Sequence, residues 1–155
     1  MLLLISFAAV AIILPILWIV NARIPPPARL GANDGLLAAC PESPNCVSSQ
    51  SKNQRSRVDP LPFSGTPETA HARIRDVIMD LPRSRLVRQT TNYLHFEFRS
   101  LVCRFVDDVE FLIDPDAGVI HARSASRVGY SDLGANQRRL DTIRQRWAAL
   151  EKRSP

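Results

Sequence analysis

The hydrophobic pattern begins with an uninterrupted apolar run. Residues 1–20, MLLLISFAAVAIILPILWIV, carry no charge, and Ser6 is their only polar residue. A helix of that length rises about 30 Å, which matches the hydrocarbon core of a bilayer. Pro15 is tolerated in a membrane span, and Trp18 lies where an interfacial aromatic residue is expected. The pattern predicts a single-pass transmembrane anchor over residues 1–22.

Two other interpretations of the N-terminal region stay open. A cleaved signal peptide is less favoured because the run is long and no basic segment precedes it, although Val20-Asn21-Ala22 could serve as a cleavage site. A lipoprotein is disfavoured because the lipobox-like Leu37-Ala38-Ala39-Cys40 lies far beyond the apolar run.

The next segment is rich in proline and small residues. Residues 23–35, RIPPPARLGANDG, contain three consecutive prolines. Such a segment is extended and semi-rigid where it is Pro-rich. We expect a linker over residues 23–35 that lifts a folded domain, residues 36–153, off the membrane.

Helical periodicity appears twice in the remaining chain. Thr66-Pro67-Glu68 predicts a helix start, with an N-cap threonine and proline at the first helical position. Leu81-Pro82 predicts its end. The apolar positions that follow helical spacing are Ala70, Ile74, Val77, Ile78 and Leu81 in the first helix, and Leu140, Ile143, Trp147 and Leu150 in a final one.

The region between these helices alternates with a period of two. The expected strands cover residues 85–90, 93–100, 101–113 and 119–128. Asp114-Pro115-Asp116-Ala117-Gly118 predicts a hairpin turn between the last two. The fold class is therefore α+β, with an antiparallel β-meander of three to five strands and two helices on one face, preceded by the transmembrane helix.

Charge narrows the choice of partners. The chain has 20 Lys and Arg against 15 Asp and Glu, a formal net charge of +5, all of it beyond the apolar run. Beside a membrane anchor, a basic excess favours anionic lipid headgroups. The arginines are scattered among acidic residues, so a nucleic-acid partner is not expected.

The cysteines give information about the cellular compartment of the domain. Two prolines between Cys40 and Cys46 force a turn that can join the sulfurs. Half of a zinc site is disfavoured because no second cysteine pair follows. A disulfide favours the periplasmic side, whereas Arg23 and Arg29 after the span favour the opposite orientation. We expect the periplasmic side, with Cys103 as a buried thiol.

Three segments resemble the domain-of-unknown-function family 1499. They are LAACPESPNCVSSQ at residues 37–50, FVDDVEF at residues 105–111 and RSASRVGYSDLG at residues 123–134. The resemblance covers about residues 36 to 147. It implies no reaction, ligand or cofactor, but it implies that these segments form the working surface.

Strand parity distributes the candidate residues of these segments over two faces. Asp108 and Glu110 share a face with Arg123 and Arg127, which we expect to be open. Cross-strand ion pairing explains these residues without any function. Asp107 falls among apolar residues and needs a partner, for which Ser124, Ser126 or the amides of residues 130–134 are the candidates. The ligand-binding candidates are Ser48, Ser49, Asp107, Asp108, Glu110, Arg123, Ser124, Ser126, Arg127, Tyr130 and Asp132.

The sequence supports a catalytic role less well than a binding role. Asp107 and Asp108 point to opposite faces and cannot converge. Ser48 and Ser49 are possible nucleophiles, but no motif supplies a base. The acidic turn at residues 114–118 resembles a calcium loop whose twelfth position is Ala125 instead of Glu. No metal site and no cofactor motif is recognised.

We therefore expect a membrane-anchored binding or assembly module for an anionic small molecule, a lipid headgroup or a protein partner. A hydrolase-like enzyme that uses Asp, Arg and Tyr residues of the second and third segments is one alternative. An accessory subunit of a membrane complex is the other.

Overall fold

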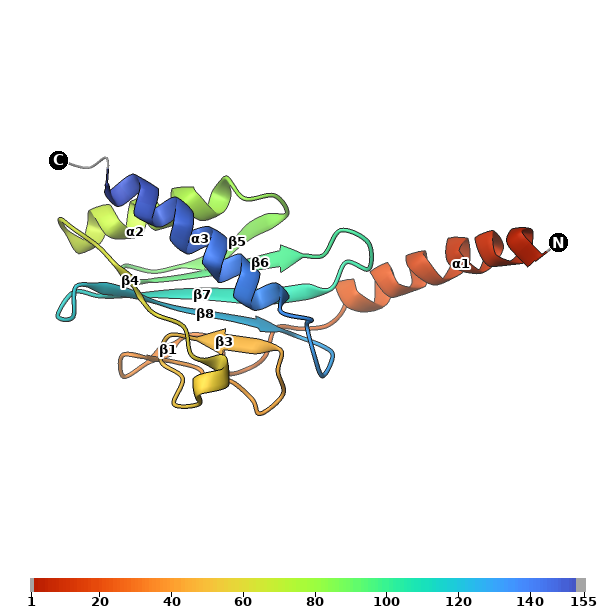
Figure 1. The fold of residues 1–155 in the computed structure, drawn as a ribbon, viewed down its shortest axis with the longest axis horizontal. Helices are drawn as coiled ribbons and strands as arrows, with labels where there is room; N and C mark the ends of the chain where they lie inside the picture. Colours follow the sequence, from red (N-terminus) through yellow and green to blue (C-terminus); the bar gives the residue numbers. More distant parts are fainter. Residues whose placement is uncertain (1, 153–155) are drawn as a thin grey trace.

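A computed structural model describes the backbone of residues 2–152 and the side chains of residues 11–152. It is an α+β fold with one main antiparallel sheet and three helices, as the class prediction required. Figure 1 shows α2 and α3 together on one side of the sheet, the segment that contains β1 on the other, and α1 extending away from the domain.

The centre of the sheet is the predicted meander. Its strands are β5 (Ser84–Gln89), β6 (Tyr93–Arg99), β7 (Val106–Asp114) and β8 (Val119–Ser126). The β7–β8 hairpin pairs Asp114 with Val119 and Glu110 with Arg123, which places the turn where the sequence predicts it. Residues 100–105 form a loop instead of strand, so the third predicted strand begins later than expected.

Two short segments extend the sheet beyond the expected three to five strands. Strands β3 (Cys46–Ser48) and β4 (Leu61–Pro62) both pair antiparallel with β8, on the edge away from β7. The sheet therefore has six strands, in the order β3-β8-β7-β6-β5 with β4 beside β8. A 3-10 helix, η1 (Gln54–Ser56), lies between β3 and β4. The period-two pattern missed β3 because a strand of three residues is too short to show alternation, whereas the proline-rich residues 60–63 are typical of the edge strand that β4 forms.

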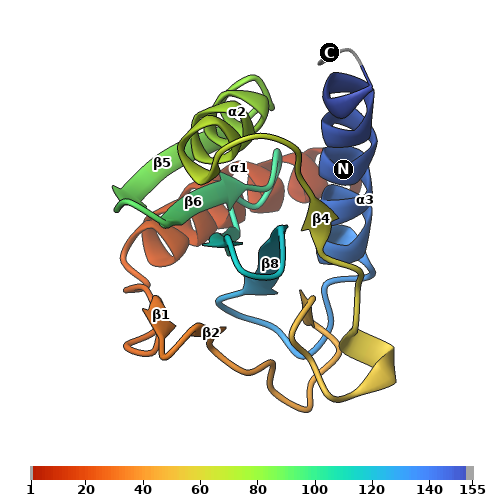
Figure 2. The same ribbon diagram turned by 90° about the vertical axis from the view of Figure 1, so that its left-hand side faces the viewer.

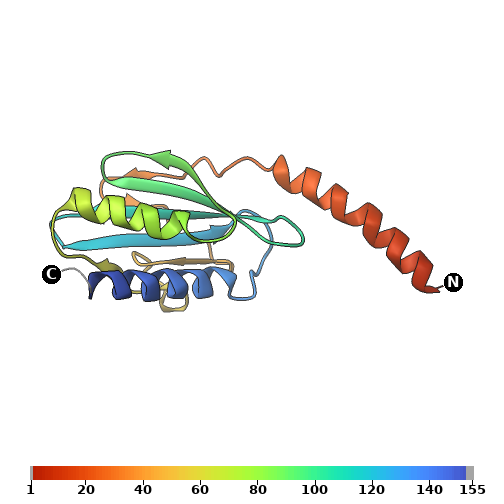
Figure 3. The same cartoon turned by 90° about the horizontal axis from the view of Figure 1, so that it is seen from above.

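Both predicted helices form and bury their apolar stripes against the sheet, except for Leu150 near the end of the second helix, which is 39 % exposed. Helix α2 (Pro67–Met79) begins after Thr66, whose hydroxyl accepts a hydrogen bond from the Thr69 amide. Helix α3 (Ala135–Glu151) packs beside it, as the view from above shows (Figure 3). One continuous core lies between them and the sheet; its large members include Ile74, Ile78, Phe96, Phe111, Ile143 and Trp147.

The predicted transmembrane anchor is the main correction. Helix α1 (Leu2–Ala22) is present, but among the described residues no helix is long and apolar enough to cross a membrane. Near its end, Asn21 donates a hydrogen bond to the Cys103 carbonyl and Trp18 donates one to the Val102 carbonyl.

The segment predicted as a linker contains part of a short hairpin and contacts the sheet. Strands β1 (Ala32–Asn33) and β2 (Leu36–Leu37) form a hairpin within residues 23–37. Its two turn residues, Asp34 and Gly35, both have positive φ, which is the usual solution for a two-residue hairpin loop. Leu37 packs on Tyr93 and Leu112 of the sheet. We call residues 24–41 the N-terminal strap, because they cross the sheet face opposite the helices (Figure 2).

Candidate functional site

The sheet face beneath the N-terminal strap is polar and buried. It carries Asp108 and Glu110 of β7 beside Arg123 of β8 and Arg127, as strand parity predicts, but this face is not open. Asp108 is 1 % exposed, Glu110 0 % and Arg123 6 %. Together with three residues of β6, these side chains form what we call the buried polar cluster: Tyr93, His95, Glu97, Asp108, Glu110, Arg123 and Arg127.

Arg127 is the centre of one half of this cluster. Its Nε and Nη2 donate to the two carboxylate oxygens of Asp108 at 2.9 and 2.7 Å, a bidentate pair. Nη2 also donates to Glu97 at 2.7 Å. His95 Nε2 lies 2.7 Å from Asp108 Oδ1. These contacts satisfy two carboxylates that would be costly to bury alone.

The same contacts keep both carboxylates ionised. Burial alone would raise the pKa of Asp108, but hydrogen bonds from Arg127 and His95 and their charges outweigh burial and lower it. The pKa of Glu97 is likewise lowered, because Arg85 and Arg127 outweigh the effect of its burial.

Glu110 is the centre of the other half. Arg123 Nη1 donates to Glu110 Oε2 at 2.9 Å, and the Tyr93 hydroxyl donates to Oε1 at 2.7 Å. Burial, followed by the charge of Glu110, raises the pKa of Tyr93 far above its usual value, so the phenol keeps its proton and remains a donor. The Nε of Arg123 is buried and has no hydrogen-bond partner among the described residues.

The N-terminal strap is tied to both halves of the cluster. The Gly31 amide donates to Glu110 Oε1 at 2.8 Å, and Arg127 Nη1 donates to the Ile24 carbonyl at 3.1 Å. At its far end, the Cys40–Cys46 disulfide joins the strap to β3, which confirms the predicted pairing. The polar cluster is therefore enclosed by a segment that the sequence analysis assigned to a spacer.

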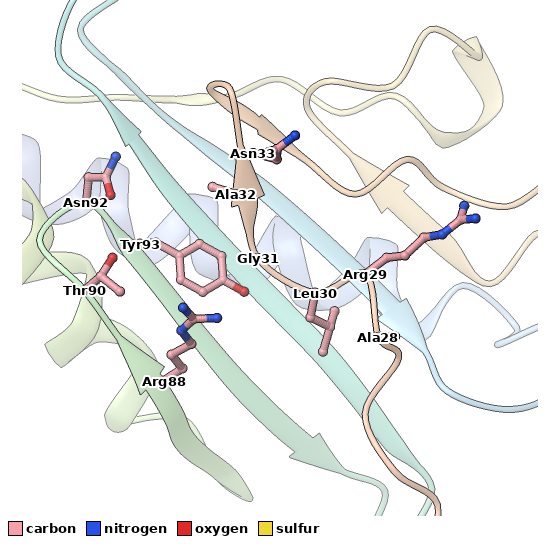
Figure 4. A pocket seen from close by; sticks show the side chains of 10 residues that line it. All are labelled: Ala28, Arg29, Leu30, Gly31, Ala32, Asn33, Arg88, Thr90, Asn92 and Tyr93. Atoms are coloured by element: carbon pink, nitrogen blue, oxygen red, sulfur yellow. The ribbon is translucent and has the colours of Figure 1, made fainter.

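Cavities lie on both sides of the strap. Figure 4 shows the first, of about 450 Å³, where Tyr93 and Arg88 face the strap from the sheet. In the same view the side chain of Arg29 extends away from these two residues. Arg29 and Leu30 also line the second cavity, of about 230 Å³, on the other side of the strap.

The second cavity is where the three recognised segments meet. The first segment contributes Ala38, Ala39 and Pro41, and the second contributes Asp108. The third segment contributes Arg123, Ala125 and Ser126. Segments far apart in sequence thus form one chamber, which we call the strap cavity.

Asp107 belongs to a different cluster on the helix side of the sheet. Its carboxylate pairs with Arg139 of α3, a residue the sequence analysis did not consider. Ser124 and Ser126 were candidate partners for Asp107, but both hydroxyls instead contact the side chain of Asn136, which is 0 % exposed. This cluster fixes α3 to the sheet.

Ser48, the last residue of β3, and Ser49, which follows it, make different hydrogen bonds. The Ser48 hydroxyl accepts from the Gln50 amide. The Ser49 hydroxyl lies 3.2 Å from His121 Nδ1, and His121 Nε2 lies 3.4 Å from Asp114 Oδ2. The order resembles a nucleophile with its base, but Ser49 is buried and accepts the Ala122 amide at 3.0 Å. We assign these contacts to the pairing of β3 with β8.

Tyr130 and Asp132 lie outside the strap cavity. The Asp132 carboxylate accepts from the Gly134 and Asn136 amides and caps the start of α3. Tyr130 is 78 % exposed. Both residues line a third cavity, of about 530 Å³, whose opposite wall includes the disulfide turn at Pro41 and Cys46.

Within the described part of the chain, no group of three or more His, Cys, Asp or Glu residues is arranged to hold a metal ion. Cys103, predicted to be a buried thiol, is a half-exposed free cysteine in the loop between β6 and β7.

The sequence analysis missed several residues of the polar cluster. His95 and Glu97 alternate with the core residues Leu94, Phe96 and Phe98, so their shared face was visible, but polar residues on a strand are usually solvated. Only the strap above them shows that they are buried.

The fold and the cavity define an α+β domain that encloses a charged chamber between a sheet face and an N-terminal strap. The chain belongs to the family described as "Protein of unknown function (DUF1499)", whose model matches residues 36–147. No curated protein and no solved structure matches the chain.

Proposed function

We propose that this protein is a binding module that holds a small anionic molecule in the strap cavity. The observation that carries the proposal is the convergence of all three family segments on this one chamber. A surface built only for stability would not require the disulfide turn, the centre of β7 and the end of β8 to share a cavity.

The charged residues of the cavity support an anionic ligand. Arg123 and Arg29 both line it, and their guanidinium groups carry two positive charges. Asp108 also lines the chamber, but its two oxygens are occupied by Arg127 and His95.

The size of the chamber favours a small molecule over a loop of a partner protein. Its volume of about 230 Å³ is below the roughly 300–1,000 Å³ of pockets for drug-sized ligands. Strap residues line it on the side away from the sheet.

Native mass spectrometry of the full-length, oxidised chain tests the proposal. We expect a discrete extra mass on the protein as isolated, or binding of small anions added to it. Ala125→Leu places a larger side chain on the buried wall of the cavity and is expected to abolish this binding without removing any charge.

Ala149→Leu is the matched control, because Ala149 is exposed on α3 and far from the strap. Equal binding by the Ala125→Leu variant and the control would contradict the proposal. So would a protein that carries no extra mass and takes up no added anion.

We also propose that the domain works in an oxidising compartment. The Cys40–Cys46 disulfide supports this, because such bonds are rare where glutathione keeps thiols reduced. Thiol trapping in intact cells tests it. A reagent that modifies Cys103 should leave Cys40 and Cys46 unmodified, and modification of all three would contradict the proposal.

A further inference from the structure

The exposed apolar side chains of the described chain are concentrated at one end of the domain. Most of the large ones lie in two segments, residues 12–20 of α1 and residues 101–105 in the loop between β6 and β7. In Figure 1 this loop projects beyond the sheet on the side where α1 leaves the domain. Exposed apolar patches of this kind mark sites of contact with another surface. We use the name end patch for Trp18, Leu101, Val102 and Phe105.

The loop of the end patch is closed at its base and attached to α1. The Ser100 amide donates to the Phe105 carbonyl, and the Phe105 amide donates to the Ser100 hydroxyl, both at 2.9 Å. The carbonyls of Val102 and Cys103 accept hydrogen bonds from side chains of α1, at 2.6 and 2.8 Å. The loop therefore presents mainly side chains to a partner. Because its shape is fixed before contact, binding costs little conformational entropy.

Cations surround the end patch without carboxylate partners. Arg104 lies over the Trp18 ring, with its Cζ 6.0 Å from the ring centroid. Arg23 follows the end of α1, and Arg83 donates to the carbonyl of the last residue of β6. None of these three arginines pairs with a carboxylate among the described residues. Residues 99–106 contain no Asp or Glu. The end patch therefore complements a surface that is apolar inside and negatively charged at its edge.

We propose that the end patch docks on the surface of an anionic lipid bilayer. Leu101, Val102 and Phe105 enter the boundary between headgroups and acyl chains. Trp18 lies at the level of the headgroups, and Arg104 is attracted to their phosphates. Such contact with a bilayer surface needs no helix that crosses it. It is also independent of any ligand in the strap cavity.

The backbone of the loop favours a lipid surface over a protein partner. The Val102 and Cys103 carbonyls are already occupied by α1, so they offer no acceptor for hydrogen bonds of fixed geometry across a protein interface. A bilayer surface takes up apolar side chains and attracts cations without requiring such bonds.

Fluorescence of the full-length, oxidised chain tests the proposal. In a Cys103→Ser background the disulfide leaves no free thiol, so Leu101→Cys can be labelled alone with an environment-sensitive fluorophore. We expect its emission to shift to the blue on vesicles of equal parts phosphatidylcholine and phosphatidylglycerol. Leu36→Cys in the same background is the matched control, because Leu101 is 69 % exposed and Leu36 59 %. Leu36 lies at the opposite end of β6, next to Leu37 on Tyr93, and its label should not shift.

Co-sedimentation with the same vesicles tests the role of charge. Arg104→Gln removes one unpaired cation and is expected to weaken binding to the mixed vesicles about fivefold, the effect of one basic residue near an anionic surface. Binding to vesicles of phosphatidylcholine alone should not change. Arg75→Gln, at an exposed pair with Asp76 on α2, is the control and should bind as the unaltered chain does.

Three results would overturn the proposal. The first is an emission at position 101 that does not respond to the vesicles, or that shifts no more than the emission at position 36. The second is equal binding of the Arg104→Gln variant and its control to the mixed vesicles. The third is a blue shift at position 101 that appears without lipid as the protein concentration rises, which would assign the end patch to contact between two copies of the chain.

Discussion

Arg127 joins three parts of the molecule through one guanidinium group. It pairs with Asp108 on β7 and Glu97 on β6, and it donates to the Ile24 carbonyl of the strap. Its side chain is 5 % exposed, so none of these contacts is made in water. Removal of such a residue leaves uncompensated charge in the interior, which costs more than the loss of a surface pair.

Replacement of Arg127 by Ala is therefore expected to lower the free energy of unfolding by about 3–5 kcal/mol, because Asp108 loses its bidentate partner. Arg75→Ala removes an exposed pair and is expected to cost less than about 1 kcal/mol. Urea denaturation of both variants measures the difference. Similar midpoints for the two would show that the buried polar cluster contributes little.

At the scale of elements, the N-terminal strap turns a polar sheet face into an interior. Its hold on the sheet depends on the Gly31 amide at one point and on the disulfide at its end. Gly31 has φ of +122°, well outside the left-handed helical region near +57° that non-glycine residues can adopt. Gly35, at +75°, lies much closer to that region.

Gly31→Ala is therefore expected to destabilise the strap more than Gly35→Ala. The expected cost is roughly 1–3 kcal/mol for Gly31→Ala and about 1–2 kcal/mol for Gly35→Ala. Hydrogen exchange provides the measurement. Amides of residues 24–41 should exchange faster in the Gly31 variant, with the core of β6 and β7 unchanged. The opposite order of the two variants would contradict the assigned role of Gly31.

A separate prediction concerns the disulfide at the end of the N-terminal strap. It closes a short loop, with a sequence separation of 6, and the chain-entropy relation assigns such a loop about 2 kcal/mol. The double variant Cys40→Ser, Cys46→Ser should lose about that much stability and bind anions more weakly, because Pro41 and Ala39 form one wall of the strap cavity. Cys103→Ser is the control and should change neither stability nor binding.

At the scale of the whole molecule, the sheet separates two interiors of different kind. Helices α2 and α3 cover an apolar core on one face, and the strap covers ionised side chains on the other. The ionised side chains buried beneath the strap make the free energy of unfolding depend on pH. Asp108 and Glu97 both have a lowered pKa in the folded chain, so protonation favours the unfolded state.

The sign of this dependence follows from the lowered values. The stabilisation is fully present above the unfolded pKa values, about 3.9 for Asp and 4.3 for Glu, and is lost as the pH falls below them. Urea denaturation between pH 7 and pH 3 should show a plateau above about pH 5 and a decline below it. Asp108→Asn should flatten the decline, and an unchanged profile in that variant would contradict the linkage.

Several particular features were predictable from sequence. Period-two alternation placed Asp108 and Glu110 on one face with Arg123 and Arg127, because neighbouring strand residues alternate by geometry. The hairpin turn at residues 114–118 and the cap at Thr66 carry local signals that need no tertiary context. The partner of Asp107 carried no such signal, because Arg139 lies on a helix whose packing onto β7 and β8 fixes the pair.

The sequence by itself determined the α+β class, the meander, the helix positions and the disulfide pairing, since each depends on local periodicity, turn chemistry or short spacing. Only the tertiary structure decided that residues 24–41 fold back over the polar face, that this face is buried, and that the three family segments share a cavity. The physical reason is that contacts between Gly31 and Glu110, or Ile24 and Arg127, join residues far apart in the chain. No local pattern records such contacts.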